Sequence, residues 1–248
     1  MPQSVLGVIP ARFSSTRFPG KALVRIGGKS MIQHVFERAS RARSLSRLLI
    51  ATDDERIFEE ARRFGAAVRM TSPDHPSGTD RVAEAASTEP HPVVVNIQGD
   101  EPLIDPGAID TAVLALLDDP ECPMATLKKR IERASEAANP NVVKVVTDQR
   151  GRAIYFSRAP IPFHRSGNPI HFKHIGLYVY RRDFLLRYPK LPIGPLERAE
   201  SLEQLRALEN GYPIRVAETG YDSMGVDTPE DLQRLTLLTE DTEPKEGR

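Results

Sequence analysis

Cysteine, tryptophan, net charge and long apolar runs are scarce or absent in this 248-residue chain. A single cysteine, Cys122, excludes an intrachain disulfide and a multi-cysteine metal site. Lys and Arg together number 34, as do Asp and Glu, so the basic excess typical of nucleic-acid or membrane-surface binding is missing. No apolar run reaches the roughly 18 residues of a membrane span, and the N-terminus lacks a signal-peptide pattern. We therefore expect a soluble, cytoplasmic protein with neither nucleic-acid nor membrane partners.

Strand and helix patterns alternate along the first half of the chain. Apolar runs at 5–9 and 92–98 are each followed further on by amphipathic segments, at 30–42 and 106–117. The β-branched run inside 92–98 is typical of a central strand in a parallel sheet. This alternation predicts an α/β fold with a mainly parallel central sheet and helices on both faces.

From about Met124 onward, strand-like runs follow one another with fewer helices between them. A capping box at Ser201–Gln204 predicts one helix start. Thr228 followed by Pro229 and two acids predicts another. The strands expected in this half are 125–128, 142–147, 153–156, 174–180 and 214–218.

We expect one domain over residues 1–238, followed by a polar, disordered tail over 239–248. Within it, residues 153–180 are expected to form a smaller lobe through which two copies associate. Exposed-looking apolar residues broken by Pro and Gly are typical of an interface. The alternative is a lobe that folds back on its own sheet. The apolar residues concerned are Tyr155, Phe156, Ile161, Phe163, Ile170 and Phe172.

The most informative segment follows the first predicted strand. Residues 10–21 contain two arginines, a lysine, three hydroxyl side chains and a Pro-Gly turn. Small residues and fixed cations after a strand bring N–H groups and positive charge to a polyphosphate. Ligands also sit at this edge of α/β sheets. A solvated surface loop is the alternative; the phosphate-binding candidates are Arg12, Arg17 and Lys21.

Two carboxylates stand at predicted loop edges. Asp100 follows the strand at 92–98, and Asp227 precedes the last predicted helix. A turn or cap role is the alternative for each. Mg²⁺ prefers a few carboxylates together with phosphate oxygens and water. The two aspartates beside a cationic loop therefore fit a Mg²⁺-bound triphosphate.

A third element, at 74–81, joins a Gly-containing loop to a helix start. Its amides and hydroxyls fit a nucleobase or a phosphate. An ordinary capped loop, with Ser77 or Thr79 as N-cap, is the alternative. Gly28–Ser30 looks like the end of a P-loop, but Leu23 stands where that motif requires glycine.

In their order and spacing, eight motifs resemble those of the 3-deoxy-manno-octulosonate cytidylyltransferases over about residues 5–238. Each motif alone is a modest signal, and together they are specific. They are Ile9–Arg12 with Ser15–Lys21, His75–Arg81, Asn96–Pro102, Asn139–Val146, Tyr155–Arg158, His174–Tyr178, Leu202–Arg206 and Gly225–Asp231.

The resemblance implies a nucleotidyltransferase-type, Rossmann-like fold, a homodimer and Mg²⁺ as cofactor. It implies transfer of CMP from CTP to 3-deoxy-D-manno-octulosonate (Kdo), giving CMP-Kdo and pyrophosphate for lipopolysaccharide biosynthesis. Arg12, Lys21, Asp100 and Asp227 would be catalytic, the two aspartates by binding the metal. The implied nucleotide-binding residues are Ala11, Arg12, Arg17, Lys21, Ser77, Gly78 and Arg81. The implied sugar-binding residues are Gln98, Arg158, His174, Tyr178, Glu203 and Gln204.

A 2-keto sugar acid needs at least one charge-assisted donor. We expect Arg158 and His174 to meet its carboxylate and hydroxyls. Two alternatives stay open. One is a cytidylyltransferase for a related acid, such as 8-amino-Kdo or a sialic acid. Sialic acid enzymes, however, carry Gly-Gly-Ser-Lys-Gly-like residues where this chain has Phe13–Arg17. The other is a catalytically silent nucleotide-binding or regulatory protein, against which the retained aspartates and Lys21 speak.

Overall fold

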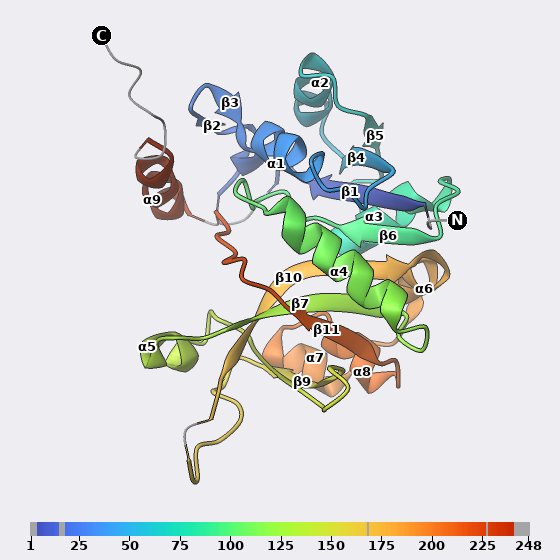
Figure 1. Cartoon of the computed structure of the whole chain (residues 1–248). Helices are drawn as coiled ribbons and strands as arrows, with labels where there is room; N and C mark the ends of the chain where they lie inside the picture. The colour runs from blue at the N-terminus through green and yellow to red at the C-terminus, as the bar shows by residue number, and fades with distance from the viewer. Residues whose placement is uncertain (1–3, 15–17, 168, 227, 241–248) are drawn as a thin grey trace.

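One mixed sheet organises the chain in our computed structural model, which describes residues 4–14, 18–167, 169–226 and 228–240 (Figure 1). Its strands are β1 (Val5–Ala11), β4 (Arg47–Thr52), β5 (Val68–Met70), β6 (Val93–Asn96), β7 (Met124–Arg130), β8 (Lys144–Thr147), β9 (Ala153–Ser157), β10 (Phe172–Arg181) and β11 (Ile214–Glu218). The main path runs β11-β7-β10-β6-β1-β4-β5. Neighbours are parallel, except that β10 is antiparallel to both β6 and β7. The mainly parallel α/β sheet is therefore confirmed.

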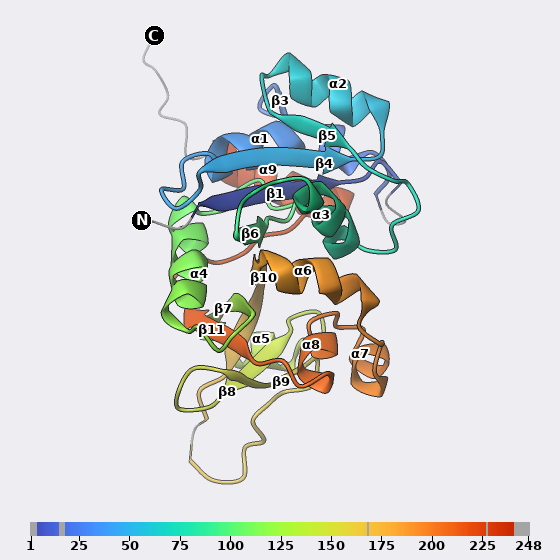
Figure 2. The same cartoon turned by 90° about the vertical axis from the view of Figure 1, so that its right-hand side faces the viewer.

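Helices cover both faces of this sheet (Figure 2). Strand residues alternate between two apolar cores: in β1, Val5 and Ile9 join one, and Leu6 and Val8 join the other. The first core takes α1 (Met31–Ala39), α2 (Glu55–Arg63) and α4 (Pro106–Asp118); the second takes α3 (Gly78–Ser87), α6 (Arg182–Arg187) and α8 (Leu205–Glu209). The remaining elements are the hairpin β2 (Arg25–Ile26) and β3 (Lys29–Ser30), η1 (Lys21–Leu23), α5 (Ala134–Ala138), η2 (Tyr188–Lys190), α7 (Pro195–Glu200) and α9 (Pro229–Glu240). Among the described helices, none is both long and apolar enough to traverse a bilayer.

The stretch 153–180 divides between a peripheral hairpin and the main sheet. β9 pairs with β8, and β8 meets the start of β10. The end of β10 lies inside the main sheet, where Tyr178 pairs with Asn96 of β6. The loop between β9 and β10 projects from the body, and its Phe163 is 84% exposed (Figure 1). The expected lobe therefore shares its second strand with the central sheet.

The predicted helix start at Ser201–Gln204 is wrong. Ser201 has a left-handed backbone, with φ of 51°, and ends α7 instead, because its N–H donates to the carbonyl of Glu197. The next helix, α8, begins only after Gln204. The start at Thr228 is confirmed: its Oγ1 accepts from the Asp231 N–H at 3.2 Å, and the Asp231 carboxylate accepts from the Thr228 N–H at 2.9 Å. α9 continues to Glu240, two residues into the expected tail.

Candidate functional site

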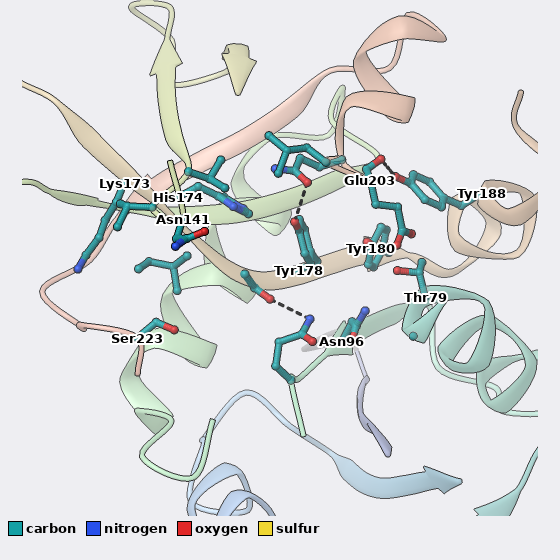
Figure 3. Close-up of a pocket in the computed structure, with 18 residues that line it drawn as sticks. Thr79, Asn96, Asn141, Lys173, His174, Tyr178, Tyr180, Tyr188, Glu203 and Ser223 are labelled. Atoms are coloured by element: carbon teal, nitrogen blue, oxygen red, sulfur yellow. Dashed lines mark hydrogen bonds between the residues drawn. The ribbon is translucent and has the colours of Figure 1, made fainter. Parts of the chain in front are cut away.

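A cavity of about 480 Å³ opens where β6 ends, between the start of α3 and the middle of β10 (Figure 3). It collects side chains from segments that are far apart in the sequence, including 141–143 and 202–204. Ligand sites of α/β folds lie at this edge, beyond the carboxyl ends of the parallel strands. Among the predicted residues, its lining contains Gly78, Gln98, His174, Tyr178, Glu203 and Gln204.

Three buried polar atoms of this lining have no hydrogen-bond partner among the described residues: Asn96 Oδ1, Glu203 Oε1 and Gln204 Nε2. A buried polar atom without a partner is costly, so such atoms are suited to a ligand that completes them. Two acceptors and one donor match a molecule with several hydroxyl groups. Sequence reasoning missed Asn96, although it begins the Asn96–Pro102 motif.

The neighbouring side chains are held in place by hydrogen bonds. Tyr178 Oη donates to Gln204 Oε1 at 3.1 Å, and Gln98 Nε2 donates to the carbonyl of Gly176 at 3.1 Å (Figure 3). Tyr188 Oη donates to the carbonyl of Glu203 at 2.7 Å. The lining is therefore largely preorganised, which reduces the entropy that a ligand must lose on binding.

Of the two residues expected to meet the carboxylate and hydroxyls of the sugar acid, His174 carries no positive charge. Its ring lies 5.0 Å from the Phe156 ring and 5.4 Å from the Tyr178 ring, and its Nε2 is 2.9 Å from Thr126 Oγ1. Burial lowers the pKa of His174 to about 3, so the imidazole is neutral at physiological pH. Burial also raises the pKa of Glu203 above its usual range. The cationic side chain in the described lining is Lys173, which pairs with Glu136 at 2.6 Å and also with Asp222.

The neutral, buried His174 leads to a prediction about how stability depends on pH. An unfolded chain protonates this imidazole near pH 6.5, whereas the folded protein resists protonation until about pH 3. Acid therefore favours unfolding in this window, by up to about 1.4 kcal/mol per pH unit from this group. Urea titrations between pH 7 and 4 should show a shallower loss in His174→Gln than in the wild type. Equal slopes in both proteins would contradict a neutral, buried His174.

Arg158 lies beside the cavity and is not part of its described lining. Its Nε donates to the carbonyl of Glu200 at 2.8 Å, and its Nη1 donates to the carbonyl of Pro140 at 3.1 Å. The Glu200 carboxylate accepts from the Arg158 N–H at 2.8 Å. Arg158 thus ties together the two segments that lead into 141–143 and 202–204.

A second group of predicted residues meets where β1 ends. Lys21 Nζ lies 2.6 Å from Asp100 Oδ2, and it also donates to the carbonyl of Val226 at 3.3 Å. Gly99 allows the loop that carries Asp100 to come close to the end of β1, because a Cβ at that position would lie 2.7 Å from the carbonyl oxygen of Pro10. Ala11 ends β1 in the core, and Arg12 follows it at the surface. The predicted residues Arg17 and Asp227 lie outside the described residues.

Asp100 is the described carboxylate that fits a metal ion at this edge. Its side chain is 29% exposed and supplies hard oxygen donors, which Mg²⁺ prefers. Within the described ranges, no three His, Cys, Asp or Glu residues cluster so as to hold a metal without a substrate. A site of few carboxylates suits Mg²⁺, which usually keeps waters and takes phosphate oxygens from the substrate.

The loop before α3 carries the predicted nucleotide residues Ser77, Gly78 and Arg81. Ser77 is the N-cap of α3, as the capping alternative predicted: its Oγ accepts from the Asp80 N–H at 3.2 Å. Arg81 is fully buried and turns into the protein, where Nη2 lies 2.5 Å from Asp53 Oδ2 and Nη1 lies 2.5 Å from Thr71 Oγ1. Gly78 is the member of this group that lines the cavity.

Sequence reasoning also missed Glu101, which follows Asp100. Its side chain is buried and accepts hydrogen bonds from Tyr221 and Ser223. Burial raises the pKa of Glu101 to about 7, assisted by the charge of Asp100 and opposed by these hydrogen bonds. The only local signal was an acid directly after the predicted metal ligand.

Known proteins resemble this chain over nearly its whole length. The cytidylyltransferase family profile matches residues 6–218. The 3-deoxy-manno-octulosonate cytidylyltransferase of Solibacter usitatus is 66% identical over 240 residues, covering 96% of this chain and 95% of the relative. The enzyme of that name from Geobacter sulfurreducens is 54% identical and covers 94% of this chain and 98% of the relative.

A solved structure gives the same result in three dimensions. A CMP:2-keto-3-deoxy-manno-octonic acid synthetase, solved in complex with CTP, superposes with a TM-score of 0.93 at 44% identity. The match covers 97% of this chain and all of the solved one. Profile, sequence and structure agree with the family that the motifs indicated. This chain belongs to the cytidylyltransferase family, and within it to the 3-deoxy-manno-octulosonate cytidylyltransferases.

Proposed function

We propose that this protein transfers CMP from CTP to Kdo, giving CMP-Kdo and pyrophosphate for lipopolysaccharide biosynthesis. One observation supports the proposal beyond family membership: a pocket suited to a compound with several hydroxyl groups adjoins a cation suited to phosphate. Gln98 lines the cavity with the unpartnered polar atoms, and two residues later Asp100 meets Lys21. A sugar acid and a nucleoside triphosphate would therefore lie side by side. A cytoplasmic location stays a prediction, supported by the use of CTP.

The proposed reaction is an in-line displacement. The anomeric hydroxyl oxygen of Kdo forms a bond to the α-phosphorus of CTP, the bond to the bridging oxygen of pyrophosphate breaks, and the hydroxyl proton passes to water. Lys21 and Arg12, with Arg17 predicted beside them, offset the charge that builds on the phosphoryl oxygens. Positioning and charge stabilisation supply most of the rate.

Mg²⁺ is the proposed cofactor. Asp100, with Asp227 as the second ligand predicted from the sequence, would hold it, and the ion would neutralise phosphate charge. Ala11, Ser77 and Gly78 are the proposed contacts of cytosine and ribose. For Arg81 the proposal changes to a supporting role, because its guanidinium is committed to Asp53 and Thr71.

The substrate is best tested by pyrophosphate release from CTP across a panel of sugar acids. Kdo, 8-amino-Kdo and N-acetylneuraminate differ at the groups that the pocket would bind. Replacing CTP with UTP tests the preference for the cytosine base. The proposal expects kcat/KM to be highest for CTP with Kdo. A preference for another acid would establish the related-substrate alternative. Nucleotide binding without turnover of any acid would establish the silent binding protein.

Arg158→Ala should raise the KM for Kdo about tenfold or more while leaving the KM for CTP nearly unchanged. The substitution unties the segments around Pro140 and Glu200 that lead into the sugar pocket, and geometric errors there weaken binding and catalysis. Steady-state kinetics with each substrate varied in turn measures both constants. A change confined to CTP would move Arg158 to the phosphate side of the site.

We also propose a homodimer that involves the stretch 153–180. Of the apolar residues expected there, Phe163 and Ile170 are 84% and 49% exposed, and Ile154, which was not among them, is 61% exposed; exposed apolar residues are typical of an interface. Phe156 is instead fully buried in the second core, so the expectation was wrong for that residue. A two-fold dimer would bury this region against its own copy. Light scattering at micromolar concentration should give about twice the 27.6 kDa mass of the chain. A fully active monomer would disprove the dimer.

A further inference from the structure

Glu101 lies where two segments about 120 positions apart in the sequence meet. One is the loop after β6 that carries Asp100, and the other is the linker between β11 and α9. Glu101 is 6% exposed, and Lys21 pairs with its neighbour Asp100. A carboxylate is rarely buried in this way unless it is satisfied by hydrogen bonds.

The linker provides those hydrogen bonds. Ser223 Oγ donates to Glu101 Oε1 at 2.7 Å, and Tyr221 Oη donates to Glu101 Oε2 at 3.0 Å. Both carboxylate oxygens are thus used by side chains two residues apart on the same linker. Together they fix the linker to the loop at two points, which sets its direction as well as its distance.

Main-chain hydrogen bonds extend this attachment to the proposed phosphate site. The N–H of Val226 donates to the carbonyl of Asp100 at 2.9 Å. The carbonyl of Val226 accepts from Lys21 Nζ, which also holds Asp100 Oδ2. Val226 further packs with Ile26, Met31 and Leu235, so that the linker, the hairpin β2–β3 and α9 share one small core.

We propose that Glu101 is a positioning residue that clamps the linker 219–226 onto the Asp100 loop, and so fixes the geometry of Asp100 and Lys21. It touches neither substrate nor metal in this role. The inference rests on the proposed function, because it concerns the site at which we place the triphosphate and its metal ion. Groups that orient a metal ligand typically change metal affinity or activity by 10–100-fold when they are removed.

The test uses the full-length protein and Mn²⁺ as a spectroscopic probe of the metal site. Electron paramagnetic resonance measures Mn²⁺ affinity in the presence of α,β-methylene-CTP, which does not release pyrophosphate. Glu101→Ala should weaken Mn²⁺ binding by about tenfold or more. It should also raise the Mg²⁺ concentration that gives half-maximal turnover, with little change in the KM for Kdo.

Milder variants cover the case in which Glu101→Ala fails to fold. Tyr221→Phe and Ser223→Ala each remove one hydrogen bond to Glu101 and nothing else from its carboxylate. Each should weaken Mn²⁺ binding by about threefold, which corresponds to a typical net hydrogen bond of somewhat under 1 kcal/mol. If Glu101 is the common clamp, the double variant should be no worse than Glu101→Ala.

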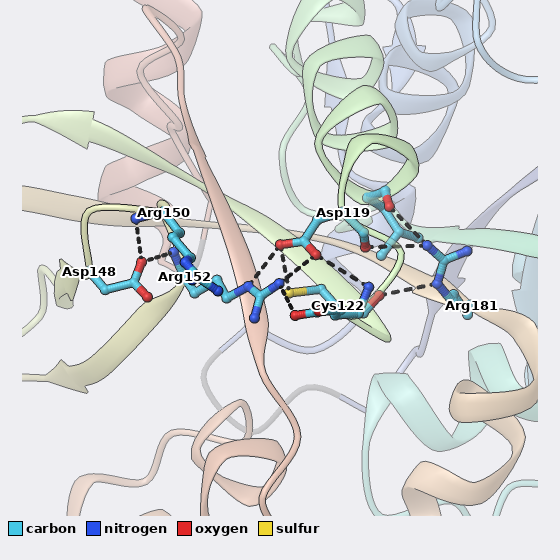
Figure 4. A network of polar contacts seen from close by, with 8 residues as sticks. Asp119, Cys122, Asp148, Arg150, Arg152 and Arg181 are labelled. Atoms are coloured by element: carbon cyan, nitrogen blue, oxygen red, sulfur yellow. Dashed lines mark hydrogen bonds and ion pairs between the residues drawn. The ribbon is translucent and has the colours of Figure 1, made fainter.

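Asp119→Asn is the matched structural control. Asp119 also ties two distant segments, because Arg152 Nε and Nη2 donate to its carboxylate at 2.9 and 2.8 Å (Figure 4). This network joins the turn after α4 to the β8–β9 hairpin, away from Lys21 and Asp100. The control should lower the melting temperature while leaving Mn²⁺ affinity unchanged.

Three results would overturn the inference: Mn²⁺ affinity within twofold of the wild type in folded Glu101→Ala, the same in folded Tyr221→Phe/Ser223→Ala, or an equal loss in Asp119→Asn. Failure of the proposed function is distinguishable, because the wild-type protein itself would then release no pyrophosphate from CTP and Kdo.

Discussion

Asp100→Asn is expected to lower kcat by about a hundredfold or more. The substitution keeps the shape of the side chain and an oxygen for Lys21 Nζ, now 2.6 Å away, but removes the negative charge that would hold Mg²⁺. CTP binding should weaken far less, because Lys21 and the cationic loop remain. Turnover and CTP affinity, measured at limiting and at saturating Mg²⁺, separate the two effects.

Asp105→Asn is the control for this change. Asp105 lies on the same loop but is the N-cap of α4, where its Oδ1 accepts from the Gly107 N–H at 3.1 Å. Asparagine caps helices as well as aspartate does, so this variant should keep wild-type kinetics. Near-normal turnover of Asp100→Asn at limiting Mg²⁺ would reduce Asp100 to a turn residue.

Arg81→Leu is expected to lower the free energy of unfolding by about 3 kcal/mol. Arg81 is fully buried against Asp53, and its removal leaves a carboxylate that is 12% exposed without its cation. Breaking a buried ion pair by deleting one partner is costly for this reason. Chemical denaturation measures the loss directly.

Lys29→Leu provides the comparison, because Lys29 pairs with Glu37 at the surface, where the two side chains are 47% and 34% exposed. Exposed pairs contribute little, so this variant should lose much less stability than Arg81→Leu. In Asp53→Leu/Arg81→Leu the stability should partly return, since neither charge is left alone. A stable Arg81→Leu protein with a raised KM for CTP would instead support direct nucleotide contact by Arg81.

Much of the fold was predictable because its signals are local. The β-branched run at 92–98 became β6 in the centre of the sheet, and the Thr228–Asp231 motif capped α9 as expected. Local signals fail where the same residues could end one helix or begin the next. The sequence at Ser201 is typical of a helix start, yet α7 begins at Pro195, and Ser201 caps its C-terminal end.

The site was harder to predict, because its chemistry depends on burial and on distant partners. An imidazole ordinarily has a pKa near 6.5, whereas burial beside Phe156 and Tyr178 lowers the pKa of His174 to about 3. Arg81 reads as a nucleotide contact, but its partner Asp53 stands 28 positions away. Glu101 meets Tyr221 across 120 positions, a pairing that no local pattern specifies.

The central claim is that Lys21 and Asp100 activate CTP beside a pocket that binds Kdo. The most direct measurement is product formation by the purified protein with CTP, Kdo and Mg²⁺, followed by pyrophosphate release and by mass spectrometry of the sugar nucleotide. We predict CMP-Kdo and pyrophosphate in equal amounts, with both lost in folded Asp100→Asn and Lys21→Met. Pyrophosphate without CMP-Kdo, or undiminished product from both variants, would contradict this account.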